Sequence, residues 1–196
     1  LRSKPIKIRK FINEKQYSKK IKEKKQVSHS YYLIGFKTAN INDKDSHILD
    51  LVSVILGYGQ SSRLFNEIRM KRGLSYNVGC VHDCNKTYGY FAAYVSTENK
   101  KVDLCKKLIL KEFKLENLNE QEIEDAKKLL EGTRLLKNED TRELAVSLGH
   151  WEFFKCDARE FYNYIKRIKD VTKKDILRVV KKYFNEKYTE VLISNN

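Results

Sequence analysis

The sequence predicts an α+β fold, in which helices pack on one face of a mostly antiparallel sheet. Two observations predict this class. Short runs with alternating or aromatic-rich apolar residues, typical of strands, lie mainly before residue 99, whereas amphipathic helical patterns dominate after it. Two of the strand runs are joined by a short polar connector, which favours an antiparallel hairpin. With 41% hydrophobic and 11% aromatic residues, the 196-residue chain can bury a core of this kind.

The first strand and the first helix are predicted within residues 27–57. Residues 27–36 read VSHSYYLIGF, with apolar side chains at both odd and even positions. Such a pattern is typical of a central strand that is covered on both faces. Residues 43–57 then place apolar side chains at helical spacing and stop at Gly57, which predicts a buried amphipathic helix.

A second helix of about three turns is predicted at 61–73, in the stretch SSRLFNEIRMKRG. Ser61 or Ser62 is placed to cap its N-terminus, and Gly73 is placed to end it. Three basic residues in it are interpreted as surface or cap charges, namely Arg63, Lys71 and Arg72. Ion pairs at i,i+4 spacing are expected for Arg63 with Glu67 and for Glu67 with Lys71.

The rest of the chain contains the hairpin, a helical block and a closing strand. The runs LSYNVGCVHDC and YGYFAAYVST, separated by a turn at 85–87, predict the two strands of the hairpin. The pairs Asn119/Glu122 and Thr172/Asp175 are spaced as capping boxes at the start of two later helices. Helices are therefore expected at 102–113, 120–133, 141–155, 158–169 and 173–184, followed by a strand in YTEVLIS at 188–194.

The positive charge of the chain is concentrated near its N-terminus. Residues 1–25 contain eleven Lys or Arg and two Glu, so this stretch supplies +9 of the net charge of +14. We interpret residues 1–26 as a basic linker or edge segment and residues 27–196 as a single domain, because lysines protect an edge strand against further pairing. A phosphate-binding arm is the alternative. The absence of a recognition motif or of a groove with interleaved aromatic and basic residues argues against nucleic acid as a partner.

The composition indicates a soluble protein from the cytoplasm or another reducing compartment. No apolar run approaches the roughly 18 residues of a membrane span, which argues against a membrane partner. The four cysteines form no C-x-x-C pair. Cys80, His82 and Cys84 share one face of a predicted strand, but the outer two lie about 13 Å apart at strand rise, so packing is favoured over a zinc site. The chain begins with Leu1 rather than Met and is expected to be a piece of a longer protein.

The stretch LGYGQSSRLFNEIRMKRGLSYNVG, followed by YGYFAAYVSTENKK, resembles the C-terminal domain of the pitrilysin-like zinc metallopeptidases, the group that includes mitochondrial processing peptidase. The resemblance extends over residues 27–193. It implies half of an enzyme, because these proteins are built from two related α+β domains that enclose a chamber. The first domain carries an inverted H-x-x-E-H motif, whose two His and a later Glu bind zinc and whose intervening Glu is the general base.

None of the four histidines of this chain, His29, His47, His82 and His150, stands in that motif. The resemblance therefore implies no catalytic residue and no metal ligand in this chain. Zinc would be bound by the missing N-terminal domain of the same or a partner polypeptide, and the present chain alone is expected to be inactive.

The second domain of the family supplies an arginine and a tyrosine, seven residues apart, that reach the substrate backbone near the scissile bond. Arg69 and Tyr76 match this spacing, and both can donate hydrogen bonds to a peptide carbonyl as it gains negative charge. The alternative is structural. Arg69 lies about 95° round its predicted helix from the centre of the apolar stripe, where it could snorkel, and Tyr76 shares the phase of Leu74 and Val78 and could be core.

The leading hypothesis is that this chain is the C-terminal, substrate-binding half of a zinc-dependent endopeptidase that cleaves peptides or unfolded segments in a closed chamber. The alternative is a non-catalytic partner or scaffold subunit of the same family, with no active zinc domain. The residues encoded upstream of Leu1 would separate the two hypotheses. The expected partners are the N-terminal zinc domain and a peptide substrate, and a homodimer remains open.

Overall fold

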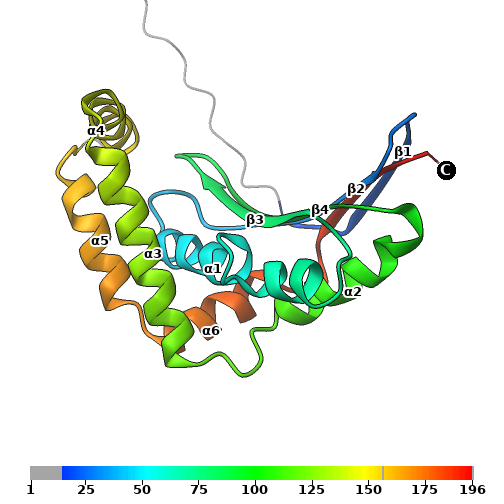
Figure 1. The fold of residues 1–196 in the computed structure, drawn as a ribbon. Coiled ribbons are helices and arrows are strands. Elements are labelled where there is room, and N and C mark those ends of the chain that lie inside the picture. The colour runs from blue at the N-terminus through cyan, green and yellow to red at the C-terminus, as the bar shows by residue number, and fades with distance from the viewer. Residues whose placement is uncertain (1–14, 156, 196) are drawn as a thin grey trace, which may run out of the picture.

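The computed structural model describes residues 15–155 and 157–195, which form one five-stranded sheet with helices on one side (Figure 1). The order across the sheet is β1-β5-β2-β4-β3. Neighbouring strands run antiparallel except β1 and β5, which are parallel. This arrangement confirms the predicted α+β class. The strands are β1 (Lys19–Lys24), β2 (Ser30–Lys37), β3 (Asn77–Cys84), β4 (Gly89–Thr97) and β5 (Thr189–Ser194).

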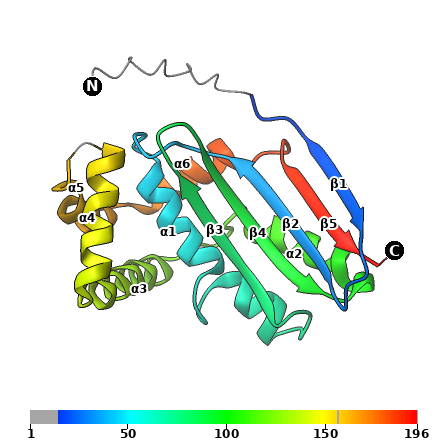
Figure 2. The same ribbon diagram turned by 90° about the horizontal axis from the view of Figure 1, so that it is seen from above.

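The helices lie in two groups (Figures 1 and 2). In Figure 1, α1, α2 and α6 lie beneath the sheet, whereas α3, α4 and α5 form a block beyond the β3 edge. The predicted hairpin and all of the predicted α-helices after residue 99 are confirmed. The bounds are α1 (Ser46–Gly57), η1 (Phe65–Met70), η2 (Asn99–Lys101), α2 (Val102–Glu112), α3 (Glu120–Asn138), α4 (Thr141–Lys155), α5 (Glu160–Asp170) and α6 (Lys173–Tyr183).

The core lies between the sheet and the first group of helices. Side chains with no exposed surface come from the middle of β2 and β4 and from the inner faces of α1, η1 and α2, including Ile34, Phe91, Leu51, Ile68 and Ile109. Both predicted capping boxes are present. Asn119 and Glu122 bond each other's backbone N–H groups at the start of α3, as Thr172 and Asp175 do at the start of α6.

The prediction that β2 is covered on both faces is wrong for this chain. Alternate residues of β2 face the helices and are buried, but Tyr31 is 49% exposed and Leu33 is 37% exposed. The strand register places Leu33 directly opposite Tyr94 of β4, so these side chains share the uncovered face. No helix of the described residues packs there. We call this surface the open face; its large exposed residues are Ile21, Tyr31, Leu33, Val81, Tyr90 and Tyr94.

The basic N-terminal stretch contributes the edge strand β1. Residues 19–24 pair in parallel with β5, and all six are exposed. Four of the six are lysines, which discourage a further strand from pairing at this edge. Residues 1–14 of the predicted linker lie outside the described residues.

The helix predicted at 61–73 is shorter and more widely wound than expected. Residues 65–70 form the π-helix η1, in which the Lys71 amide donates to the carbonyl of Asn66, five residues earlier, at 2.9 Å. Gly73 ends the segment as predicted, with a φ of 57°. Ser62 does not cap it through an N–H group; its hydroxyl donates to the Gly59 carbonyl at 2.8 Å.

The predicted ion pair between Arg63 and Glu67 does not form, and the interpretation of Arg63 as a surface charge is wrong. The Arg63 side chain is 14% exposed and turns inward, where its Nε and Nη2 donate to the two carboxylate oxygens of Glu122 at 2.8 and 3.0 Å. Its Nη1 donates to the Glu116 carbonyl at 2.9 Å. Glu67 instead pairs with Lys71, as predicted, and with Arg72 at 2.5 Å. A bidentate bond to a carboxylate on α3 therefore outcompetes an exposed pair within one helix.

Asp45, at the start of α1, anchors this helix to α6. Its side chain is fully buried and accepts hydrogen bonds from Arg178 Nη1 at 2.8 Å, Lys182 Nζ at 2.6 Å and the Tyr183 hydroxyl at 3.1 Å. Burial alone would raise the pKa of Asp45, but the bonds from Lys182 and Arg178 outweigh it and lower the pKa below its ordinary value.

We expect Asp45→Asn to lower the free energy of unfolding at pH 7 by about 3 kcal/mol, because it leaves two cations without their buried partner. A carboxyl whose pKa is lowered by folding stabilises the fold above its unfolded pKa of about 3.9 and loses this effect as the pH falls through its folded pKa. Urea unfolding at pH 7 and at successively lower pH should therefore show that Asp45→Asn loses less of its free energy of unfolding on acidification than the wild type does. Asp103→Asn, at an exposed position on α2, is the control. If the wild type and Asp45→Asn lost the same free energy of unfolding on acidification, the stabilising role of the ionised Asp45 carboxylate would be contradicted.

Arg63→Met should lower the free energy of unfolding by about 3 kcal/mol, because it leaves the partly buried Glu122 without its cation. Arg142→Met, at an arginine that is 81% exposed, should change it by less than about 0.5 kcal/mol. Urea denaturation of both variants measures the difference. Equal stability of the two would contradict a structural role for Arg63.

Candidate substrate-binding site

Arg69 and Tyr76 lie side by side at the end of β3. Arg69 comes from η1, and Tyr76 from the bend that leads into β3. The guanidinium carbon of Arg69 is 3.9 Å from the centroid of the Tyr76 ring and 4.8 Å from that of Phe65, which are cation–π distances. Arg69 Nη1 also makes a long hydrogen bond of 3.5 Å to the Tyr76 carbonyl. The two predicted site residues are thus brought together.

Tyr76 is not a core residue. It is 81% exposed, although by strand phase it belongs with Val78 and Cys80, which face the helices. Tyr76 precedes the first residue of β3, Asn77, and its ring therefore lies outside the core between the sheet and the helices. Within the described part of the chain, the phenol hydroxyl forms no hydrogen bond. The structural alternative for Tyr76 is contradicted.

The segment that carries Tyr76 is fixed by two hydroxyl groups. Ser75, which is buried, donates from its Oγ to the Ser96 carbonyl of β4 at 2.6 Å. Thr97 Oγ1 donates to the Leu74 carbonyl at 2.5 Å. The backbone on each side of Tyr76 is therefore held against the end of β4, although its ring is exposed.

The π-helix sets the direction of Arg69. Ile68 is fully buried and anchors the inner side of η1. The wider winding of a π-helix changes the angle between successive side chains relative to an α-helix, and such turns are frequent at functional sites. Arg69 accordingly follows Ile68 out of the core and lies between the rings of Phe65 and Tyr76. The sequence pattern of an ordinary helix did not predict this winding.

A shallow groove of about 300 Å³ adjoins Tyr76. It runs between the bend before β3 and the end of β4, and it is lined by His29, Leu74, Tyr76, Asn77, Glu98 and Lys101, among others. A groove beside the paired donors provides room for an extended segment of a ligand. Its residues come from three separate parts of the chain, which is why the sequence did not single them out.

The described residues contain no cluster of three or more His, Cys, Asp or Glu side chains that could hold a metal ion. Cys80, His82 and Cys84 do lie on the helix-facing side of β3, but each has other contacts. His82 Nδ1 bonds Asp50 Oδ1 at 2.7 Å, and the Cys84 thiol lies 3.2 Å from the Ser46 hydroxyl. Burial raises the pKa of the Cys80 thiol. This part of the chain therefore does not fit a zinc ion.

Within residues 15–155 and 157–195, every helix is too short or too polar to cross a bilayer.

Comparison with known proteins gives consistent matches over most of the chain. A protein from Rickettsia felis named "Uncharacterized zinc protease" is 30% identical over 88% of this chain and 42% of its own length. A Helicobacter pylori protein named "Non-peptidase homolog YmxG" is 32% identical over 65% of this chain and 30% of its own length. A crystal structure of a protease from Helicobacter pylori superposes with a TM-score of 0.82 at 21% identity, over 91% of this chain and 44% of that one.

The chain spans less than half of the length of these relatives. The sequence profile described as "Peptidase M16 inactive domain" matches residues 2–130, which include η1, the hairpin and both candidate site residues. The resemblance to pitrilysin-like zinc metallopeptidases is thereby confirmed. The chain belongs to the family of the peptidase M16 inactive domain.

Proposed function

We propose that this chain is the substrate-binding half of a zinc-dependent endopeptidase that cleaves peptides or unfolded segments inside a closed chamber. The observation that carries the proposal is the pairing of the half-buried Arg69 with the exposed Tyr76, stacked at 3.9 Å beside a groove at the end of the sheet. The coarser assignment, membership of a zinc protease family in which this domain is the inactive part, rests on the family match.

The chemistry of the pair suits a peptide backbone. A guanidinium and a phenol both donate hydrogen bonds, and both bonds strengthen as the oxygen of the scissile carbonyl gains negative charge. Because Arg69 is already stacked between Phe65 and Tyr76, less conformational freedom is lost when the substrate binds. Binding and transition-state stabilisation would then be one interaction.

The open face supports the presence of a second half. Ile21, Tyr31, Leu33, Tyr90 and Tyr94 give this surface an apolar and aromatic character, and each of them is exposed among the described residues. An exposed apolar surface that spans several strands typically marks an interaction site. We propose that the N-terminal zinc domain, in the same or a partner polypeptide, faces this surface across the chamber.

The metal belongs to that other half, since this chain offers no group that fits it within the described residues. When bound, zinc lowers the pKa of a coordinated water towards neutrality and so supplies the attacking nucleophile. The role of the present chain would be to hold the peptide backbone so that the scissile carbonyl carbon faces that nucleophile. In this scheme Arg69 and Tyr76 orient the substrate and neutralise developing charge.

In the full-length protein, Arg69→Ala should lower kcat/KM for a peptide substrate by about 100-fold, the typical cost of removing one charge-stabilising donor. Tyr76→Phe, which removes only the hydroxyl, should lower it by about 10-fold. Zinc content, measured by atomic emission, should be unchanged in both variants, because neither residue is a ligand.

Matched controls are available nearby. Arg72→Ala removes an arginine of the same segment, and Tyr88→Phe removes the hydroxyl of an exposed tyrosine at the hairpin turn. Both should retain wild-type kcat/KM. Unchanged kinetics in Arg69→Ala and Tyr76→Phe would return this pair to a structural role.

A non-catalytic partner or scaffold subunit is the second candidate. It is favoured by one finding, the Helicobacter pylori relative named a non-peptidase homolog. The two candidates differ outside this chain, in the presence of H-x-x-E-H and a later Glu upstream of Leu1. If the full-length protein lacks that motif and binds no zinc, the scaffold function replaces the enzymatic one.

A further inference from the structure

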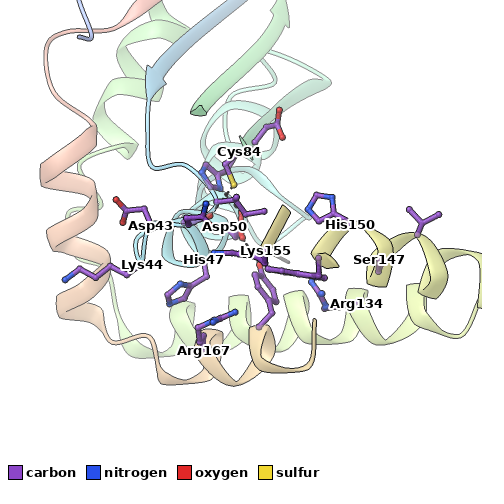
Figure 3. Close-up of a pocket in the computed structure, with 18 of the residues that line it drawn as sticks. Asp43, Lys44, His47, Asp50, Cys84, Arg134, Ser147, His150, Lys155 and Arg167 are labelled. Carbon is purple, nitrogen blue, oxygen red and sulfur yellow. Dashed lines mark hydrogen bonds and ion pairs between the residues drawn. The ribbon is translucent and has the colours of Figure 1, made fainter. Parts of the chain in front are cut away.

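A second and larger cavity lies at the β3 edge of the sheet, between α1 and the block of α3, α4 and α5. It has a volume of about 590 Å³, within the range of small-molecule sites. Its walls come from α1, the end of β3, and the block of α3, α4 and α5 (Figure 3). Arg69, Tyr76 and the groove beside them contribute nothing to it. Any ligand of this cavity would therefore occupy a site separate from the proposed peptide site.

A hydrogen-bond network centred on Asp50, whose side chain is 28% exposed, lines the cavity. Asp50 of α1 bonds His82 Nδ1 through Oδ1 at 2.7 Å, and its Oδ2 accepts from the Tyr164 hydroxyl of α5 at 2.8 Å. The His82 side chain is fully buried, and its Nε2 has no partner among the described residues. Both oxygens of Asp50 are thus engaged within the protein.

The other acidic residues of the wall also have partners. Asp43 Oδ1 accepts from the Asp45 amide at 2.8 Å, and Asp83 accepts a hydrogen bond from Tyr90. Glu143 pairs with Arg142 at 3.2 Å and with Lys137 at 3.9 Å. The carboxylates of the cavity are therefore already occupied by neighbouring groups.

Three cations of the wall, Lys44, Arg134 and Lys155, form no ion pair within the described part of the chain, and two of them, Arg134 and Lys155, are partly buried. Arg134 of α3 lies over aromatic rings, with its guanidinium carbon 4.5 Å from the centroid of Tyr164 and 4.8 Å from that of Phe161. Neither it nor Lys155 of α4 forms an ion pair within the described part of the chain. Burial lowers the pKa of both, and Arg167 lowers that of Lys155 further. In Figure 3, Lys155 lies between Arg167 on one side and Arg134 on the other.

We propose that this cavity binds a small organic anion through a carboxylate or phosphate group held between Arg134 and Lys155. A planar guanidinium stacked on aromatic rings presents its N–H groups in a fixed fork, which matches carboxylate and phosphate oxygens. An ammonium adds a second point of positive charge. Carboxylates lie near both cations, Asp50 near Arg134 and Glu160 near Lys155, but neither cation forms a direct ion pair within the described residues. The anion would supply that direct partner, while the aromatic walls accept the organic part of the ligand.

The proposal is tested by isothermal titration calorimetry of the full-length protein with inorganic phosphate, succinate and citrate. We expect one-site binding of at least one probe, and a comparison of phosphate with the two carboxylates identifies the preferred head group. Arg134→Gln and Lys155→Gln should each weaken this binding by at least 10-fold. Arg142→Gln, on α4 but outside the cavity wall, should leave it unchanged.

The cavity is distinguished from the peptide site by Arg69→Ala, which should leave anion affinity unchanged. Because Arg134 also packs against rings, circular dichroism and thermal melting establish whether Arg134→Gln folds. If Arg134→Gln does not fold, Lys155→Gln still decides the test, because it removes no ion pair of the described residues. Binding that is equal in wild type, Arg134→Gln and Lys155→Gln, or no heat with any of the three probes, would overturn the proposal.

Discussion

The bidentate bond between Arg63 and Glu122 is the constraint on which the candidate site depends. The Glu122 carboxylate completes the capping box of α3 and also accepts a hydrogen bond from Arg63 Nε at 2.8 Å. Arg63 therefore ties the start of η1 to the N-terminus of α3 and, through the Glu116 carbonyl, to the loop before it. Ile68 fixes the opposite side of η1 in the core. Arg69 projects from a segment held at both ends, as a preorganised binding residue requires.

The two faces of the sheet have different roles. The helix-facing side buries a continuous core, in which Asp45 joins α1 to α6 through charged hydrogen bonds. The open face carries aromatic residues on β2 and β4 but receives no helix from the described chain. The apolar residues on both sides of β2 therefore serve two surfaces, one buried in the core and one exposed on the open face. The chain spans less than half of the length of these relatives.

Features encoded by neighbouring residues could be predicted from the sequence, whereas features made by distant residues could not. The two capping boxes, the hairpin and Gly73 depend on spacings of a few residues. Arg63 and its partner Glu122 are 59 positions apart in the sequence, whereas the local i,i+4 spacing predicted Glu67 as the partner. The pairing of Arg69 with Tyr76 was predicted through a family resemblance, but its stacked geometry depends on a π-helix that has no local signature. The cavity at Asp50, Arg134 and Tyr164 was missed because it is assembled from separate helices.

The π-helix has a further consequence for how this segment can evolve. A π-turn contains one more residue than the α-turn that would otherwise connect the same two points. Between the bond at Arg63 and the left-handed residue Gly73, both of which are fixed, there is no loop to absorb a change in length. Loss of a single residue here would rewind the segment as an α-helix and rotate position 69 away from Tyr76. Natural variation in this stretch should accordingly exchange side chains while keeping the residue count constant.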